Sequence, residues 1–351
     1  MALAVFKTYS AGEVLTASDL NSSFTTIHNN ALSLISPLTG NLAAGGFVLT
    51  GLGAGAANGE SVRFEQLAAA APLQICEFRL TLTSATPVTN SDVTSATTVY
   101  VSPYKGNRIA LYDGSTRWNV RSSAEMSIAV PATTDTMYDL FCYDNSGTPT
   151  LEALAWSSDT ARATNLTLQD GVLVKSGATT RRYLGSFRTT GVSGRTEDSF
   201  AKRYVWNYYN RVRRAMRVLE ATNSWTYTNT TIRQANGSTA NQLDMVVGWS
   251  EDVVTADIFV SVFNTNAQVQ VVVGVGLDAT NTFTAGNLCY GMTNAANTTL
   301  IVTAQWKGYV GHGRHFLSWN EHSAATGTTT WVGDGGLTTT QQSGIHGELW
   351  G

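Results

Sequence analysis

Histidine is unevenly placed in this sequence, and its clustering is the first pattern that could support chemistry. Four of the five histidines lie in the last forty residues: His312, His315, His322 and His346. Imidazole is a common ligand of zinc and other transition metals, and His312 and His315 have the HxxH spacing. On a strand this spacing places the two rings on opposite faces, whereas a glycine-rich loop could bring them together. Polar loop histidines at a surface or subunit contact are the simpler interpretation, so no metal or other cofactor is expected.

Large aromatic side chains also accumulate near the end of the chain. Exposed Trp and Tyr rings can stack on sugar rings, and both residue types are enriched at protein-binding hot spots. The alternative is that most of these rings fill a core or a subunit interface. The aromatic and histidine residues together define the expected receptor-binding surface: Trp306, Tyr309, His312, His315, Trp319, His322, Trp331, His346 and Trp350.

Pairs of carboxylates would indicate a glycosidase, because acid and base catalysis of glycoside hydrolysis needs two of them at a fixed separation. Candidates are Glu251 with Asp252, Glu321 and Asp334. With 25 acidic residues in the chain, however, some pairs look suggestive by chance. The sequence also has no GxSxG, P-loop or HExxH motif and no long regular repeat of the β-helix depolymerases. We therefore do not expect an enzyme, and a polysaccharide depolymerase is the least favoured alternative.

The composition limits the possible partners. Charged residues make up only 13% of the 351 residues, against roughly 25% in ordinary soluble domains. The net charge of −3 gives no electrostatic reason to bind nucleic acid or an anionic membrane. No apolar run approaches the roughly 18 residues of a membrane helix, and the short apolar start lacks the basic residues of a signal peptide. Three widely spaced cysteines argue against a disulfide framework.

The elements that would position these residues begin with an amphipathic helix, predicted over residues 16 to 35. Thr16 or Ser18 can cap its start, and Pro37 follows its end. One helix of this length cannot bury its apolar face alone, and copies of itself are the simplest partner. The expected seam of self-association is this apolar face, which becomes the trimer seam under the family resemblance described below: Leu20, Phe24, Ile27, Ala31 and Leu34.

The remaining chain is predicted to be mainly β. Residues 37–73 form a glycine-rich stalk with a short helix, which follows the attachment region of residues 1–36. Residues 74–200 and 218–351 form two β-sandwich or jelly-roll-like domains, and residues 201–217 form an extended connector between them. Turn signals such as Asn145-Ser146-Gly147 and Asp170-Gly171 separate the strands. The predicted strands are Arg108 to Tyr112, Met137 to Tyr143, Gly171 to Lys175, Leu243 to Trp249, Asp257 to Phe263, Val269 to Gly276 and Leu300 to Trp306. The apolar run Val269 to Val273 should be central and buried on both faces.

Several stretches resemble virion fibre proteins of tailed bacteriophages. Tyr9 to Phe24 is similar to the particle-attachment start of many tail fibres, and Gly40 to Leu67 resembles their stalk motif. Thr81 to Gly114 and Leu168 to Lys175 resemble β modules of phage and prophage tail proteins. The order of these motifs along one chain is more specific than any one of them.

The resemblance implies a homotrimer in the virion that is assembled in the host cytoplasm. Its N-terminus would bind another virion protein, and its distal C-terminal β domain would attach the particle to a surface glycan or protein of the bacterial host. A passive head or collar decoration fibre is the alternative.

Overall fold

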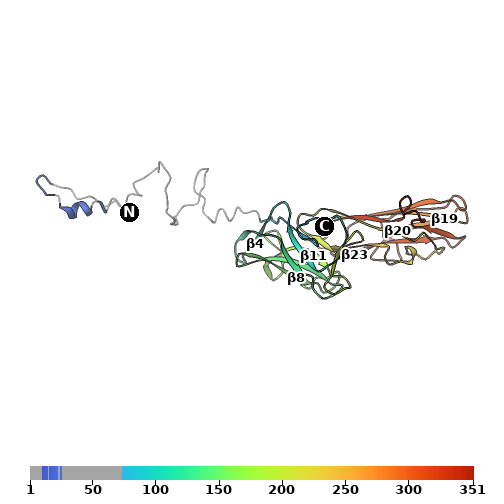
Figure 1. Ribbon diagram of the computed structural model, residues 1–351, viewed down its shortest axis with the longest axis horizontal. Helices are drawn as coiled ribbons and strands as arrows, with labels where there is room; N and C mark the ends of the chain where they lie inside the picture. The colour runs from blue at the N-terminus through green and yellow to red at the C-terminus, as the bar shows by residue number, and fades with distance from the viewer. Residues whose placement is uncertain (1–9, 15, 23, 26–72) are drawn as a thin grey trace. The chain divides into compact units, whose positions relative to one another are not determined.

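The structure is a computed structural model that describes residues 10–14, 16–22, 24–25 and 73–351 (Figure 1). The chain divides into two compact units, Met1–Phe64 and Glu65–Gly351. The described part of the second unit consists of β-sheets whose strand pairs are antiparallel with one parallel exception, so the predicted mainly β class is confirmed. No helix in the described ranges is long and apolar enough to cross a membrane.

The start of the predicted N-terminal helix carries a reciprocal cap. Residues 17–22 and 24–25 are helical. The Asp19 amide donates to Thr16 Oγ1 at 3.2 Å, and the Thr16 amide donates to Asp19 Oδ2 at 3.3 Å. This is the capping-box arrangement with Asp in place of Glu. Leu20 and Phe24 are 42% and 59% exposed. Ile27, Ala31, Leu34 and the predicted stalk up to residue 72 lie outside the described residues, so the trimer seam stays a prediction.

The first group of strands forms a small sandwich. Its bounds are β1 Phe78–Thr81, β3 Thr98–Pro103, β4 Arg108–Tyr112, β5 Trp118–Ser122, β6 Met126–Ala129, β7 Met137–Asn145, β8 Thr148–Ala155, β9 Leu166–Gln169, β10 Val172–Lys175, β11 Ala178–Arg188 and β14 Val205–Asn207. One sheet has the order β8-β7-β11-β10-β9 with β14 paired to β11, a second has the order β1-β3-β6, and β4 pairs with β5. Leu80, Val101, Leu140 and Phe187 belong to one buried cluster between these layers, together with the free cysteines Cys76 and Cys142.

Two of the predicted turns have the backbone geometry that their residues favour. Ser146 and Gly147 connect β7 to β8 with φ of 51° and 94°, and Asp170 and Gly171 connect β9 to β10 with φ of 51° and 81°. Positive φ at both positions of a two-residue loop matches the right-handed twist of the flanking strands. These turns therefore set the register of both hairpins.

The second group of strands forms a larger sandwich. Its bounds are β2 Val93–Ala96, β12 Thr196–Asp198, β13 Lys202–Arg203, β15 Arg213–Leu219, β16 Ser224–Thr226, β17 Arg233–Gln234, η1 Ala235–Gly237, β18 Gln242–Val247, β19 Val254–Asn264, β20 Val271–Leu277, β21 Leu288–Tyr290, β22 Leu300–Gly308, β23 Gly313–Ser323, β24 Thr329–Val332 and β25 Gly344–Trp350. One sheet has the order β17-β23-β18-β13-β12-β2, with β20 paired to β23. The other has the order β15-β25-β19-β22-β21, with β24 on β19 and β16 on β24. Figure 1 shows β19, β20 and β23 in these layers. The side chains buried between them include Leu243, Ile258, Val260, Val275, Val302, Trp319 and Ile345.

The predicted connector 201–217 needs correction. It is extended as expected, but its residues form β13, β14 and most of β15, which pair with strands from both predicted domains. One sheet joins β2 and β12, from before this segment, to β18 and β23, from after it. Backbone amides in this segment satisfy their hydrogen bonds within the sheets, so the segment is part of the fold and not a free linker.

The position of β20 also differs from the prediction. The valines of β20 are buried on both faces, as expected: Val271, Val273 and Val275 on one face are at most 1% exposed, and Val272 on the other is 9% exposed. Within the described chain, however, β20 pairs with one strand, β23. On its other edge the Val275 amide donates to Asn287 Oδ1 at 2.8 Å, and the Leu277 amide donates to Thr284 Oγ1 at 2.6 Å. A polar loop therefore covers the edge that a second strand was expected to fill.

Candidate binding face

The sheet β15-β25-β19-β22-β21 packs only one face against the core. Strand β19 alternates between buried and less buried residues along its whole length, and β15 alternates in the same way over its first five residues. Because successive side chains of a strand point to opposite faces, the second set lies on the solvent side. We name this solvent side of the five strands the outer face.

Five side chains form one cross-strand row on the outer face, which we name the Asp257 row. The register places one residue from each strand in line: Arg217, His346, Asp257, Gln305 and Leu288. Residues directly opposite each other in a sheet have Cβ atoms roughly 4.5–5.5 Å apart. Charged, imidazole and amide groups therefore stand side by side across the outer face.

The neighbouring row, which we name the Phe259 row, is largely apolar. It contains Leu219, Gly344, Phe259, Thr303 and Tyr290. Tyr290 and Phe259 are 78% and 48% exposed, and Ile301 in the next row is 70% exposed. A contiguous patch of exposed apolar side chains with polar residues around it often marks a binding surface.

Two shallow depressions lie on the outer face. Gly344 has no side chain between Leu219 and Phe259, and a depression of about 460 Å³ surrounds it. A second depression, of about 660 Å³, lies over Asp257, Gln305 and Leu288. Both volumes fall within the roughly 300–1,000 Å³ of ordinary ligand sites.

The charges on the outer face are arranged unevenly. Arg213 is ion-paired with Glu348. Partial burial raises the pKa of Asp257, an effect that His346 opposes and Glu348 reinforces. The Arg217 guanidinium lies 4.5 Å from the centre of the Phe200 ring and has no carboxylate partner among the described residues. Besides Lys307 on β22, the outer face therefore offers the Arg217 guanidinium, which is held in place but not neutralised.

Four residues of the expected receptor-binding surface are buried, and their assignment is corrected. Trp319 and Trp331 are 0% exposed, Trp306 is 6% exposed and His315 is 7% exposed. The alternation of β22, β23 and β24 turns these side chains inward. There Trp319 packs edge-on against Trp225, with the two ring centres 6.0 Å apart. They are core residues and cannot meet a receptor.

The other predicted residues are accessible but do not form one site. His346 and Trp350 lie on β25, where His346 belongs to the Asp257 row. Tyr309 is exposed in the segment after β22, and His322 is half-buried on β23. The His312 ring lies edge-on against the Trp156 ring, with the two ring centres 5.8 Å apart. The structure therefore brings only part of the expected set to the outer face.

The two histidines of the HxxH pair have different neighbours. His315 Nδ1 lies 2.8 Å from Asp278 Oδ2, while His312 precedes β23 and faces Trp156. No group of three or more His, Cys, Asp or Glu side chains that could hold a metal ion occurs in the described ranges.

The carboxylates considered for glycoside hydrolysis are engaged in local contacts. Glu251 and Asp252 both pair with Arg211. Asp334 accepts a hydrogen bond from the Gly336 amide at 2.9 Å. Glu321 is fully buried and accepts from Trp225 Nε1 and Arg233 Nε, each at 2.8 Å. Burial raises the pKa of Glu321 to about 7.

Alternation in the sequence could have identified the outer-face residues that the sequence analysis missed. Between 254 and 264, Ala256, Ile258, Val260 and Val262 share one phase, which leaves Asp257 and Phe259 in the other. By contrast, the sequence carries no signal that Arg217, Gln305 and Leu288 stand in line with Asp257, because that depends on strand pairing.

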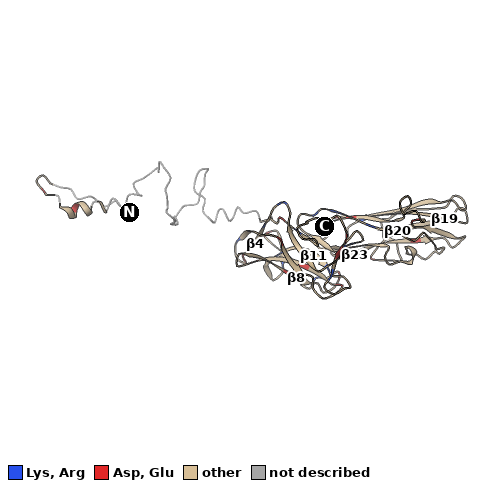
Figure 2. Ribbon diagram, viewed as in Figure 1, with Lys and Arg blue, Asp and Glu red and all other residues tan. Residues whose placement is uncertain are grey.

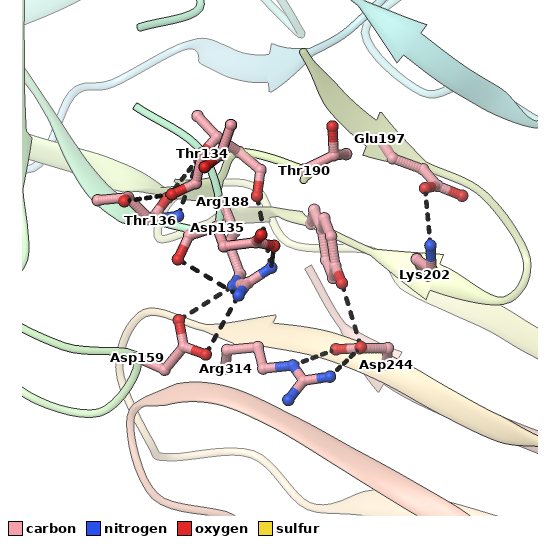
Figure 3. Close-up of polar contacts among 12 residues, drawn as sticks. Thr134, Asp135, Thr136, Asp159, Arg188, Thr190, Glu197, Lys202, Asp244 and Arg314 are labelled. Atoms are coloured by element: carbon pink, nitrogen blue, oxygen red, sulfur yellow. Dashed lines mark hydrogen bonds and ion pairs between the residues drawn. The ribbon is translucent and has the colours of Figure 1, made fainter. Parts of the chain in front are cut away.

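A polar network links the first group of strands to the second (Figure 3). Arg188 bridges Asp135 at 3.1 Å and Asp159 at 3.0 Å. Arg314 is ion-paired with Asp244, which also accepts a hydrogen bond from the Tyr204 hydroxyl at 3.1 Å. The Arg314 amide donates to the Asp159 carbonyl at 2.8 Å. The network therefore ties the 135–188 region to β18 and β23.

A second buried pair lies in the same part of the structure. Arg162 Nε lies 2.6 Å from Asp139 Oδ2, and both side chains are at most 4% exposed. Arg162 also donates to the Gly248 carbonyl at 2.6 Å, and Ser186 Oγ donates to Asp139 at 2.7 Å. Figure 2 shows few charged positions along the described ribbon, and many of them are used in such internal pairs.

Comparison with known proteins finds only weak structural likenesses. No family model matches the chain, and no curated protein matches it. Solved structures with similarity include the insecticidal delta-endotoxin Cry8Ea1 from Bacillus thuringiensis, with 9% identity and a TM-score of 0.23 over 86% of this chain and 58% of that chain. A Bacillus thuringiensis Cry1Da tryptic core variant has 9% identity and a TM-score of 0.18 over 73% of this chain and 48% of that chain. The structure of infectious bursal disease virus, Gx strain, has 9% identity and a TM-score of 0.22 over 74% of this chain and 65% of that chain. The chain spans about half to two thirds of the length of these structures, and TM-scores this low carry no functional argument.

Proposed function

We propose that this chain is a structural fibre protein of a phage virion that attaches the particle to its bacterial host. The observation that carries the proposal is the outer face, where the apolar Phe259 row runs beside the hydrogen-bonding Asp257 row. A sugar ring has apolar C–H faces and hydroxyl edges, so neighbouring apolar and polar rows suit a surface glycan. The ordered resemblance to tail-fibre motifs supports the virion location.

Multivalent binding is the mechanism in this proposal. A homotrimer carries three outer faces, and several fibres on one particle convert weak single contacts into stable attachment. The N-terminal helix supports self-association, because Leu20 and Phe24 are exposed in the single chain and need a partner. The remainder of the N-terminal region would bind another virion protein.

The test is host-cell binding by the full-length protein. Phe259→Ser and Ile301→Ser remove exposed apolar side chains from the outer face, and each is expected to weaken binding about tenfold, the equivalent of roughly 1.4 kcal/mol. Leu168→Ser is the matched control, because Leu168 is 64% exposed on β9 in the other sandwich. Melting temperatures should be unchanged in all three variants, since surface substitutions alter stability little.

Three results would contradict the proposal. Host-cell binding at wild-type strength by both outer-face variants would show that the face does not touch the receptor. If an outer-face variant changed the oligomeric state but each single chain bound host cells as before, the outer face would be a contact between subunits. The absence of host-cell binding by the wild-type protein, with antibody labelling on the capsid, would favour a passive decoration fibre.

A further inference from the structure

The depression around Gly344 has an unusual charge pattern for a chain with a negative net charge. Its lining contains Arg217 and His346 but no Asp or Glu. The hydroxyl-bearing Ser261 and the apolar Phe259 and Ile301 complete the part of the lining used below. The second depression differs, because its lining includes Asp257 and Glu348.

Arg217 is the cation that a ligand in this depression would meet. The strand that carries it is fixed on both sides, by pairing with β25 and by the Arg217 amide, which donates to the Phe200 carbonyl at 2.9 Å. Its guanidinium lies over the Phe200 ring. Arg213, two residues earlier on the same strand, is already neutralised by Glu348. Of these two outer-face arginines, Arg217 alone keeps its hydrogen-bond donors available for an anion.

A guanidinium is planar and binds a carboxylate through two parallel hydrogen bonds. Across the depression, Phe259 and Ile301 offer an apolar wall of the kind that packs against the C–H face of a sugar ring. A neutral sugar would use the wall but would leave Arg217 without an anion. A sugar with a carboxylate on its ring uses both.

We infer that this depression binds a carboxylate-bearing hexose, a hexuronic acid unit of a bacterial surface polysaccharide. Arg217 would bind the carboxylate, Ser261 and His346 would contact hydroxyls, and Phe259 with Ile301 would pack against the ring. The inference rests on the proposed glycan-binding function and deepens it by naming the class of sugar.

The experiment measures binding of single sugars to the full-length protein by ligand-observed NMR. The probes are glucuronate, galacturonate and mannuronate, each compared with its methyl ester and with the corresponding neutral hexose. The ester keeps the ring and hydroxyls but removes the charge. At least one hexuronate is expected to bind, and its ester is expected to bind at least tenfold more weakly. Binding should also weaken as salt rises, since the contact is partly exposed.

The variants locate the contact. Arg217→Ala should lower hexuronate affinity at least tenfold, because a hydrogen bond between charged groups is lost. Arg217→Lys should retain part of the affinity, since the charge stays and the bidentate geometry is lost. Arg213→Ala is the matched control and should bind like the wild type. Both positions are on the surface, and unchanged melting temperatures in all three variants would show that folding is intact.

The outcomes separate the inference from the proposed function. The inference is overturned if none of the hexuronates binds, if acid and ester bind equally, or if Arg217→Ala binds as the wild type does. Host-cell attachment that persists in any of these cases would leave the proposed function standing. Hexuronate binding that depends on Arg217 supports the inference, and loss of host-cell attachment in Arg217→Ala would extend that support to the native receptor.

Discussion

Substitution of Asp139 by leucine should destabilise the protein more than any change on its surface. The Asp139 carboxylate lies 2.6 Å from Arg162 Nε, and the two side chains are 2% and 4% exposed. The variant would leave the Arg162 guanidinium buried with the Gly248 carbonyl as its remaining acceptor. Ser186 would lose the oxygen to which it donates at 2.7 Å.

The magnitude follows from the cost of a buried charge without a partner. Removing one member of a buried ion pair costs roughly 3–5 kcal/mol, and Coulomb attraction at 4 Å in an effective dielectric of 20 gives about 4 kcal/mol. Burial raises the pKa of Asp139, and Arg162 opposes that shift, so part of the attraction only offsets desolvation. We expect the free energy of unfolding to fall by about 3–4 kcal/mol, and the melting temperature to fall by roughly 10 °C for a unit of this size.

The assay is urea denaturation of the full-length protein, completed as a double-mutant cycle. Arg162→Leu combined with Asp139→Leu should recover much of the lost stability, because an apolar pair often replaces a buried ion pair at little cost. Glu77→Gln is the control, since Glu77 pairs with the 54% exposed Arg108, and solvent-exposed ion pairs contribute little to stability. A loss below about 1 kcal/mol for Asp139→Leu, or a double variant as unstable as the sum of both single ones, would refute the reasoning.

Three further predictions concern other parts of the described chain. Burial raises the pKa of Glu321 from its usual value near 4.5 to about 7, so its contribution to stability is full below about pH 4.5 and is lost as the pH rises through 7. Relative to Glu321→Gln, the wild type should therefore lose about 3 kcal/mol between these pH values, measured by urea denaturation; equal pH profiles would contradict this. Gly248→Ala should lower the free energy of unfolding by about 1–3 kcal/mol, because a Cβ there would lie 2.1 Å from the Tyr183 hydroxyl and 2.6 Å from the Trp206 ring. Unchanged thermal stability of this variant would show that these two side chains move aside easily. Phe24→Asp should weaken self-association through the predicted helical seam, measured by analytical ultracentrifugation, and a variant as large in solution as the wild type would show that other contacts hold the oligomer.

Local patterns in the sequence account for much of the secondary structure. The predicted strand Arg108 to Tyr112 coincides with β4, and the strand predicted from Met137 to Tyr143 is β7, which extends to Asn145. Asp170-Gly171 was a sufficient signal for a hairpin, because few residue pairs accept positive φ at both positions. These features depend on neighbours within a few residues, which the sequence displays directly.

The same patterns misassigned several aromatic side chains. A Trp-rich tail is compatible with a ligand surface or with a core, since both favour large rings. Trp319 and Trp331 lie in the core because the phases of β23 and β24 turn them inward. Tyr290 and Phe259, in contrast, face solvent on the outer face.

The sequence by itself determined a mainly β chain, its principal strands, two of its turns and the start of an N-terminal helix, because each follows from periodicity, turn chemistry or capping over a short span. Only the tertiary structure decided which strands are neighbours. Register between distant segments aligned Arg217 with His346 and His346 with Asp257, and it placed Gly344 where a depression could form. Pairing of residues far apart in the sequence has no local signature, so the outer face and the unpaired Arg217 guanidinium emerge only once the sheet is assembled.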